Sequence, residues 1–159
     1  MKQLELYLET STWNFLFADD APDKRDITKT FFKVLEHGSY KIYISEVVVA
    51  EITRAPQVKR NLLENALRRY APLELKVTPE AEKLAREYVA RGIIPARKYE
   101  DGLHVAIATV TQLDAVITWN YQHLANLGRS ERFYSVNLEH KYFKRIELIT
   151  PMEVTGDES

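Results

Sequence analysis

A three-layer α/β/α fold with a central, mainly parallel sheet is the architecture that this sequence predicts. Short apolar segments of strand length alternate along the chain with longer segments of helical spacing. Strands that are separated by helices are typical of parallel sheets with helices on both faces. The 159 residues contain no internal repeat or linker, so we expect a single domain over residues 1–155 and a disordered tail at 156–159.

The first quarter of the chain is expected to form a strand and two helices. Apolar and polar residues alternate in Leu4–Leu8, which predicts a strand. The hydroxyls of Thr10–Thr12 are candidate caps for a helix that runs through Leu16. The polar segment Ala18–Asp26 contains a proline and predicts a loop, and the apolar spacing of Ile27–His37 predicts a helix.

A second strand and two further helices follow. Lys41–Ile44 predicts a short strand, and Ser45 is a candidate cap for the next helix. Val47–Ile52 is rich in valine, which is a weak helix former, so this helix is expected to be held by burial. Val58–Tyr70 has the spacing of an amphipathic helix, and Leu73–Val77 is expected to be extended.

The next segments are expected to form two helices and a buried strand. Thr78 and Pro79 form a strong helix start, and the helix is expected to end near Gly92. Asp101–Gln112 predicts a helix that is apolar nearly all round and therefore central. Asp114–Trp119 predicts a short buried strand.

The last quarter is less regular. Tyr121–Asn126 predicts a helical turn, and Ile146–Thr150 predicts a final strand that Pro151 stops. Arg129–Arg145 is a long insertion between strands that mixes aromatic and basic residues. Its sequence leaves three roles open: covering a site, forming a dimer face, or wrapping the sheet.

The composition excludes several classes of site. The chain has no cysteine, so it has no disulfide, no cysteine-ligated zinc and no thiol catalysis, which suits a reducing cytosol. The four histidines are not spaced closely enough for a zinc site. The net charge of −1 argues against non-specific coating of DNA. The sequence shows no signal peptide and no apolar run of membrane-spanning length, so we expect a cytoplasmic protein.

Four oxygen-bearing side chains lie where predicted strands end or helices begin. Glu9 follows the first strand, Glu51 lies in the helix after the second, Asp101 opens the apolar helix, and Asn120 follows a later strand. Ligands of open α/β sheets bind beyond the carboxyl ends of the strands, so these side chains are expected to share one rim. Oxygen ligands without sulfur suit Mg²⁺ or Mn²⁺, and a cation relieves the repulsion between neighbouring carboxylates.

Taken singly, each of these residues also has an ordinary structural explanation. Glu9 can be a solvated charge at a strand end, and Glu51 can pair with Arg54 on the same helix. Asp101 can be a first-turn acid that complements the helix dipole, and Asn120 can be a turn residue. The joint arrangement is what favours a metal-dependent nuclease, in which a metal-activated water attacks a phosphodiester.

Four sequence anchors carry a resemblance to a known family: Leu8–Thr12 (L-E-T-S-T), Ser45–Ile52 (S-E-V-V-V-A-E-I), Glu100–Ala108 (E-D-G-L-H-V-A-I-A) and Asp114–Leu124 (D-A-V-I-T-W-N-Y-Q-H-L). The sequence resembles the PIN-domain ribonucleases, including the toxins of bacterial and archaeal toxin–antitoxin pairs. The third and fourth anchors are the most specific. The resemblance extends from Leu4 to about Pro151.

The chain departs from the family pattern at three positions. Glu9 stands where the family usually has Asp, and Asn120 stands where Asp is frequent. Gly102 follows the third acid, where Ala is common. The T-W-N-x-x-H sequence that contains Asn120 and His123 is similar to that of one branch of the family. If the exchanges at positions 9 and 120 weaken catalysis, the alternative is a PIN-like module that binds nucleic acid or protein without cutting.

The resemblance implies roles for the rim residues. Glu9, Glu51 and Asp101 would hold Mg²⁺ or Mn²⁺, with Asn120 assisting, and cleavage would leave 5′-phosphate and 3′-hydroxyl ends. Ser11 or Thr10 would position the attacking water or a phosphate oxygen. The resemblance also implies RNA as substrate, a small antitoxin as a possible partner, and a homodimer.

Further residues are candidates for binding substrate. Arg97 and Lys98 lie just ahead of Asp101, where they can contact RNA phosphates or form a solvated face. His104 lies one turn after Asp101 and can orient that carboxylate, bind phosphate, or pack in the core. His123 lies one turn after Asn120 and can contact substrate. An unrelated α/β domain, such as a phosphoryl-transfer receiver, is a third hypothesis, but its adjacent acids and late lysine are missing.

Overall fold

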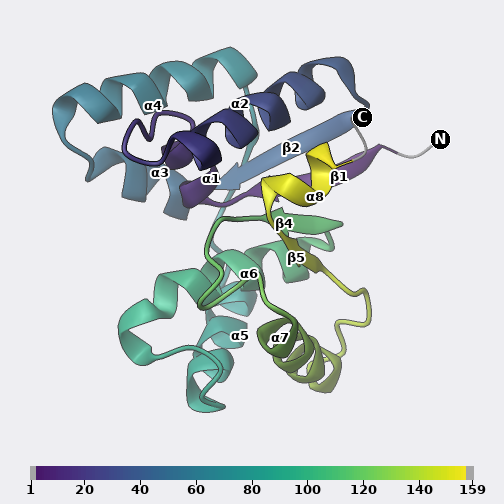
Figure 1. Cartoon of the computed structure of the whole chain (residues 1–159). Coiled ribbons are helices and arrows are strands. Elements are labelled where there is room, and N and C mark those ends of the chain that lie inside the picture. Colours follow the sequence, from purple (N-terminus) through teal and green to yellow (C-terminus); the bar gives the residue numbers. More distant parts are fainter. Residues whose placement is uncertain (1–2, 157–159) are drawn as a thin grey trace.

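The computed structural model describes residues 3–156 and contains a five-stranded parallel sheet in the order β3-β2-β1-β4-β5 (Figure 1). All four pairs of neighbouring strands are parallel, which confirms the predicted fold class. The predicted disordered tail falls on Gly156, which follows the last helix, and on residues 157–159, which lie outside the described residues. The strands are β1 (Leu4–Leu8), β2 (Tyr40–Ser45), β3 (Leu73–Leu75), β4 (Ala115–Ile117) and β5 (Glu147–Ile149).

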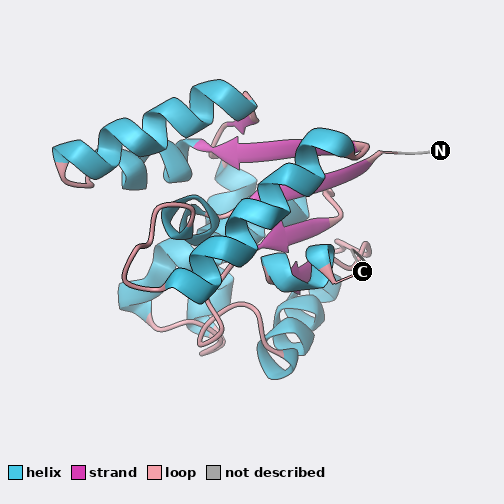
Figure 2. Ribbon diagram, turned by 45° about the horizontal axis from the view of Figure 1, so that its top comes forward, coloured by secondary structure: helices cyan, strands magenta, loops and turns pink. Residues whose placement is uncertain are grey.

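Helices cover both faces of the sheet (Figure 2). In Figure 1, α2 and α4 lie on one side of the strands, and α5, α6 and α7 lie on the other. Helix α8 packs against α2, and α5 packs against both α6 and α7. The helices are α1 (Thr10–Phe15), α2 (Pro22–His37), α3 (Glu46–Thr53), α4 (Gln57–Tyr70), α5 (Pro79–Ala90), the 3₁₀ turn η1 (Ala96–Lys98), α6 (Tyr99–Thr111), α7 (Leu127–Glu139) and α8 (Pro151–Thr155).

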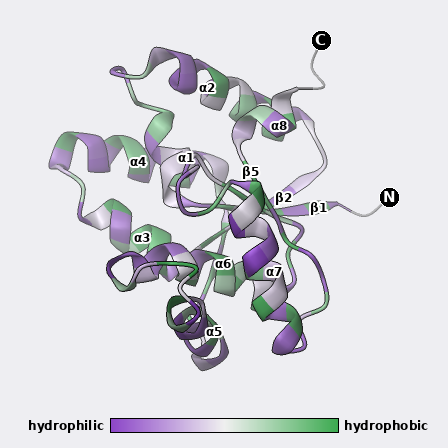
Figure 3. Cartoon of the chain, turned by 60° about the horizontal axis from the view of Figure 1, so that its bottom comes forward, coloured by the Kyte–Doolittle hydropathy of each residue, from purple (hydrophilic) through white to green (hydrophobic). Residues whose placement is uncertain are grey.

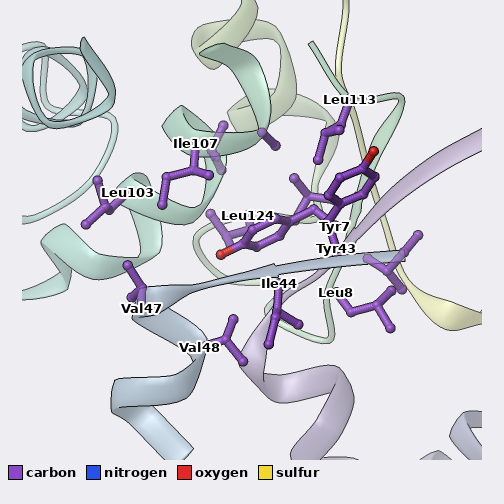
Figure 4. Close-up of a cluster of buried hydrophobic side chains, with 14 of the residues drawn as sticks. Tyr7, Leu8, Tyr43, Ile44, Val47, Val48, Leu103, Ile107, Leu113 and Leu124 are labelled. Carbon is purple, nitrogen blue, oxygen red and sulfur yellow. The ribbon is translucent and has the colours of Figure 1, made fainter. Parts of the chain in front are cut away.

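The central strands are buried on both faces. Figure 4 shows Tyr7 and Tyr43 on one side of the sheet and Leu8 and Ile44 on the other. Consecutive residues of a strand point to opposite faces, so both faces of β1 and β2 need an apolar cover. Helix α6 supplies part of it, and its residues from Gly102 to Thr109 are all buried. This confirms that α6 is central.

The strand order creates a switch point at β1. The chain passes from β1 to β2 and β3 on one side, and later places β4 and β5 on the other side. The connections that leave β1 and β4 therefore diverge at the carboxyl ends of the strands, which is where ligands of such sheets bind. Glu9 follows β1, and Thr118 follows β4.

Several local predictions are confirmed. The Ser45 side chain caps α3 by accepting a hydrogen bond from the backbone N–H of Val47. The Thr78 side chain caps α5, in which Pro79 is the first residue. Figure 3 shows hydrophilic and hydrophobic stretches alternating along α4, as its amphipathic spacing predicts.

Other local predictions are wrong at element boundaries. Helix α2 begins at Pro22 instead of Ile27, because proline is well suited to the first turn of a helix. Helix α6 begins at Tyr99, two residues before Asp101. Glu9, not a hydroxyl of Thr10–Thr12, caps α1.

The insertion predicted at Arg129–Arg145 is mostly helix α7. Phe133 and Val136 are buried on its inner face, which packs toward α5. Pro151 ends the last strand as predicted, but it also opens the short helix α8. Within residues 3–156 no helix has the length and apolar character that crossing a membrane requires.

Candidate active site

The structure brings the four predicted rim residues to the carboxyl end of the sheet. Glu9 caps α1 directly after β1, and Glu51 lies in α3, which follows β2. Asp101 lies in the first turn of α6, and Asn120 lies in the turn that follows β4. Hydrogen bonds join these segments, among them one from Thr10 to Glu51 at 2.7 Å and one from Asn120 to Asp101 at 3.1 Å.

Glu9 is buried, with 5% of its surface exposed. Its Oε1 accepts hydrogen bonds from the backbone and the hydroxyl of Ser11, and from the Thr118 hydroxyl at 2.6 Å. Ser11 Oγ in turn accepts a hydrogen bond from the backbone N–H of Trp119 at 2.9 Å. Glu9 is therefore not the solvated charge of the ordinary explanation, because it ties the end of β1 to the end of β4.

Glu51 heads a chain of buried hydrogen bonds. Its Oε1 lies 2.7 Å from Nε2 of His104, which is fully buried. The other ring nitrogen of His104 lies 2.6 Å from the Tyr7 hydroxyl, which lies 2.7 Å from Ser45 Oγ. This series of hydrogen bonds fixes the direction of the Glu51 carboxylate, since each side chain in it is itself held by packing.

Within this hydrogen-bonded group, the electrostatics favour a negative Glu51 beside a positive His104. Burial lowers the pKa of His104, but its hydrogen bond with Glu51 and the charges of Glu9, Glu51 and Asp101 outweigh burial and hold the pKa above its usual value. Burial raises the pKa of Glu51, but the bonds with His104 and Thr10 outweigh it and hold that pKa below its usual value. The negative charges of Glu9, Glu51 and Asp101 thus all stabilise the protonated form of the same imidazole.

Asp101 is held less firmly. Its Oδ2 accepts the hydrogen bond from Asn120 Nδ2 and lies 3.5 Å from Nδ1 of His123. Burial raises the pKa of Asp101, and the opposing effects of His104, Asn120 and His123 do not offset it. Asn120 also accepts a hydrogen bond from the backbone of His123, so it is a turn residue as well as a partner of Asp101.

The donor set fits a hard divalent cation in kind. In residues 3–156, hydrogen bonds engage only Oε1 of Glu9, Oε1 of Glu51 and Oδ2 of Asp101, so the second oxygen of each carboxylate accepts none. Such oxygens are the ligands that Mg²⁺ and Mn²⁺ prefer. Within the same residues no group of three or more His, Asp or Glu side chains lies close enough to coordinate one ion. Coordination requires these oxygens to converge further than they do here.

Other predicted residues have mixed outcomes. Arg97 and Lys98 are exposed in η1, directly before α6. Arg54 forms an ion pair with Glu100 at 2.9 Å, so the structure does not bear out the alternative that it pairs with Glu51. Of the three alternatives for His104, its complete burial agrees with packing in the core, and its ring nitrogens contact Glu51 and Tyr7, not Asp101.

The sequence reasoning missed Thr118 and the role of Tyr7. Thr118 is fully buried, and its hydroxyl donates to Glu9 and accepts from the backbone of Asn120 at 3.0 Å. Its position in the T-W-N anchor is the sequence feature from which a role in the site could be predicted. Tyr7 lies between two leucines, and a hydroxyl in the middle of an apolar strand indicates a buried polar partner.

A separate groove of about 440 Å³ lies between α2 and α4. It is lined by apolar residues such as Leu16 and Phe32, with Lys29, Lys33 and Arg69 among its polar residues. None of the predicted rim residues lines it. The rim and this groove are therefore distinct features of the surface.

Comparison with solved structures identifies the fold. The chain is similar to VapC20 of Mycobacterium tuberculosis, a toxin that cleaves the sarcin-ricin loop, with a TM-score of 0.59 and 17% identity over 74% of this chain and 92% of that one. It is also similar to a chain of VapBC2 from Rickettsia felis, a structure bound to a DNA fragment from their promoter. That match has a TM-score of 0.54 and 14% identity over 92% of this chain and 98% of that one.

Sequence comparison adds nothing to this result. No protein-family model matches the chain, and no curated protein matches it. The two structural matches cover nearly the whole of the proteins they belong to, so the likeness extends to the complete domain. This chain has the PIN-domain fold of the VapC-type toxins.

Proposed function

We propose that this protein is a metal-dependent endoribonuclease that hydrolyses RNA phosphodiester bonds at the carboxyl rim of its sheet. The observation that carries the proposal is the set of Glu9, Glu51 and Asp101 at the switch point. Each has one fixed oxygen and one oxygen that accepts no hydrogen bond from the part of the chain that the structure describes. The RNA-cleaving activity named for VapC20 supports this choice over other phosphodiesters.

Glu9, Glu51 and Asp101 would hold Mg²⁺ or Mn²⁺. The cation would supply the charge that offsets their mutual repulsion and the Lewis acidity that activates a water for attack on phosphorus. Thr10 and His104 orient Glu51, and Ser11 and Thr118 orient Glu9 by the hydrogen bonds described above. Ser11 and Thr10 thus act on carboxylates, which refines their predicted role of positioning water or phosphate.

Asn120 would act through Asp101. Its amide nitrogen donates to Asp101 Oδ2, which would leave Oδ1 of the carboxylate to a cation. Arg97, Lys98 and His123 would contact the phosphates of the strand that enters beside Asp101. In-line attack by water leaves a 5′-phosphate on one product and a 3′-hydroxyl on the other.

The cellular role proposed for this activity is that of a cytoplasmic toxin. The likeness to VapC20 and to a chain of the VapBC2 complex supports a small antitoxin as its partner. Pairing of two copies of the chain into a homodimer is part of the same proposal, and light scattering of the purified protein tests it.

A second candidate function is a PIN-like module that binds nucleic acid or protein without cutting it. The observation that favours it is the use of Glu9 as a helix cap, with Oε1 already engaged by Ser11 and Thr118. A carboxylate that is held by these hydrogen bonds turns less readily toward a cation. Cleavage and metal binding, measured separately, distinguish the two functions.

The test is cleavage of a mixed single-stranded RNA with Mg²⁺ or Mn²⁺, with EDTA as a control. Asp101→Asn keeps the size of the side chain and removes its charge, and Glu74→Gln makes the same change at an exposed position on β3. We expect wild type and Glu74→Gln to cut alike, and Asp101→Asn and the EDTA sample to be inactive. Cutting that persists in EDTA or in Asp101→Asn contradicts the proposal. Metal and RNA binding without cutting selects the binding module.

A further inference from the structure

Four cationic or imidazole side chains are called the basic wall: His123, which contacts Asp101, and Arg97, Lys98 and Arg129, whose charges act on His123. His123 contacts Asp101 directly at 3.5 Å. Burial lowers the pKa of His123, and the positive charges of Arg129, Lys98 and Arg97 lower it further. Three segments, η1, the turn after β4 and the start of α7, therefore place positive charge around one imidazole beside the acidic rim.

One nitrogen of the half-buried Arg129 side chain is itself buried without a hydrogen-bond partner among the described residues. Its Nη1 is the one buried side-chain nitrogen or oxygen in residues 3–156 that has no hydrogen-bond partner. Arg54, Arg91 and Arg145 each form an ion pair with a glutamate. A buried donor without an acceptor costs free energy, and the cost is higher when the donor is charged. An anion that arrives from outside the chain removes this cost.

The place of Arg129 in α7 adds to the demand for an anion. It lies in the first turn of a 13-residue helix that has no acidic residue in that turn. The N-terminal end of a helix carries partial positive charge and disfavours a cation. Arg129 therefore combines an unpaired guanidinium with a position that only a negative group would make favourable.

Phosphate is the anion whose chemistry best fits the surroundings of Arg129. A guanidinium presents parallel N–H donors that match two phosphate oxygens. Lys98 and Arg97 add point charges at an exposed position, where a strand of nucleic acid has access. The basic wall also adjoins Asp101, so a strand lying along it would pass the carboxylates.

We propose that the basic wall, with Arg129 as its central residue, binds a backbone phosphate of the single-stranded RNA that the rim cleaves. The proposal rests on the proposed nuclease function. It assigns a role to the start of α7, within the segment whose sequence left covering a site as one of three roles.

The experiment measures binding of a short fluorescent single-stranded RNA by anisotropy, in EDTA so that no cutting occurs. Arg129→Gln is compared with wild type and with Arg132→Gln. Arg132 lies in the same helix but is exposed, and its guanidinium donates to the backbone carbonyl of Arg91 at 3.3 Å. Salt is varied between about 50 and 200 mM, because each phosphate contact adds to the salt dependence of binding.

We expect Arg129→Gln to weaken binding about tenfold, the equivalent of one charge-assisted hydrogen bond. The slope of log affinity against log salt should become shallower by about 0.7, as for one lost contact to a single strand. Arg132→Gln should match wild type. Arg97→Gln, at an exposed position, should also make the slope shallower, and it decides the question if Arg129→Gln does not fold.

Two results overturn the proposal, and they differ in what else they overturn. If wild type cuts RNA while Arg129→Gln and Arg97→Gln keep wild-type affinity and slope, the basic wall is not the phosphate site and the nuclease function stands. If wild type neither binds nor cuts single-stranded RNA, both the nuclease function and the phosphate site are wrong.

Discussion

The two sides of the acidic rim are held in different ways. On the α3 side, Glu51 joins a buried chain with His104, Tyr7 and Ser45 in which every contact is 2.7 Å or shorter. On the α6 side, Asp101 has contacts of 3.1 Å with Asn120 and 3.5 Å with His123. One oxygen of Glu51 is held by two short hydrogen bonds, whereas one oxygen of Asp101 is held by longer contacts that do not offset its burial. We propose that the α3 side is mainly the scaffold of the site and that the α6 side is its binding side.

The largest expected effect separates the two histidines. His104→Ala should lower the free energy of unfolding by about 3 kcal/mol, because it opens a cavity and leaves Glu51 and Tyr7 without their partner. His123→Ala should lower it by about 1 kcal/mol, because within residues 3–156 the one polar contact of the His123 ring is the long one with Asp101. Urea unfolding of both variants in EDTA measures the difference.

Equal losses for the two variants would remove the distinction between a scaffold side and a binding side. Tyr40→Phe, a conservative change at the start of β2 away from the rim, controls for general effects of substitution. It should unfold within about 0.5 kcal/mol of wild type.

A smaller effect is expected at Thr118, which supports Glu9 between the two sides. Thr118→Val keeps the shape of the side chain and removes two hydrogen bonds, the one to Glu9 and the one accepted from the backbone of Asn120. Loss of such a supporting bond weakens metal binding by about tenfold. Titration with Mn²⁺ followed by calorimetry checks this value, and Thr53→Val, on an exposed face of α3, is the matched control. Unchanged Mn²⁺ affinity in Thr118→Val would show that Glu9 is not a ligand.

The smallest expected effect is that neutralising Asp101 and neutralising Glu51 change the free energy of unfolding in opposite directions. At about pH 7 and without metal, Asp101→Asn should raise the stability by about 0.5–1 kcal/mol, because it removes a buried charge that is poorly paired. Glu51→Gln should lower the stability, because it breaks a favourable pair.

The dependence on pH gives the same contrast. Asp101 has a raised pKa in the folded protein, so its contribution to stability is complete below its unfolded value of 3.8 and is lost as the pH rises through the folded pKa. Glu51 has a lowered pKa, so its contribution is present above its unfolded value of 4.5 and is lost as the pH falls through the folded pKa. The measurement is the free energy of unfolding of wild type, Asp101→Asn and Glu51→Gln at acidic pH. If both substitutions change its dependence on pH in the same direction, the comparison is contradicted.

The sequence predicted the parallel sheet and the shared location of four rim residues because both follow from periodicity and from the geometry of strand ends. It could not predict that His104 serves Glu51 instead of Asp101. His104 and Asp101 share a helix, but the partner of a buried ring depends on which neighbouring helix it faces. Glu51 comes from α3, which packs against α6.

Helix α7 was missed for a related reason. Its apolar inner face is short, with Phe133 and Val136 as its buried apolar residues, and charged residues surround them. A pattern of two apolar positions is too weak to predict a helix without the neighbouring helix that covers it. The unpaired Arg129 is invisible to sequence for the same reason, since satisfaction of a donor is a property of its surroundings.

The double use of Glu9 limits how this chain can diverge. An aspartate at position 9 would be a better helix cap, but its shorter side chain would draw back from Thr118 on the neighbouring strand end. An exchange between Glu and Asp therefore needs a compensating change at position 118, so the two positions should vary together among descendants of this chain. A laboratory selection that starts from Glu9→Asp should recover second-site changes at Thr118 before changes elsewhere.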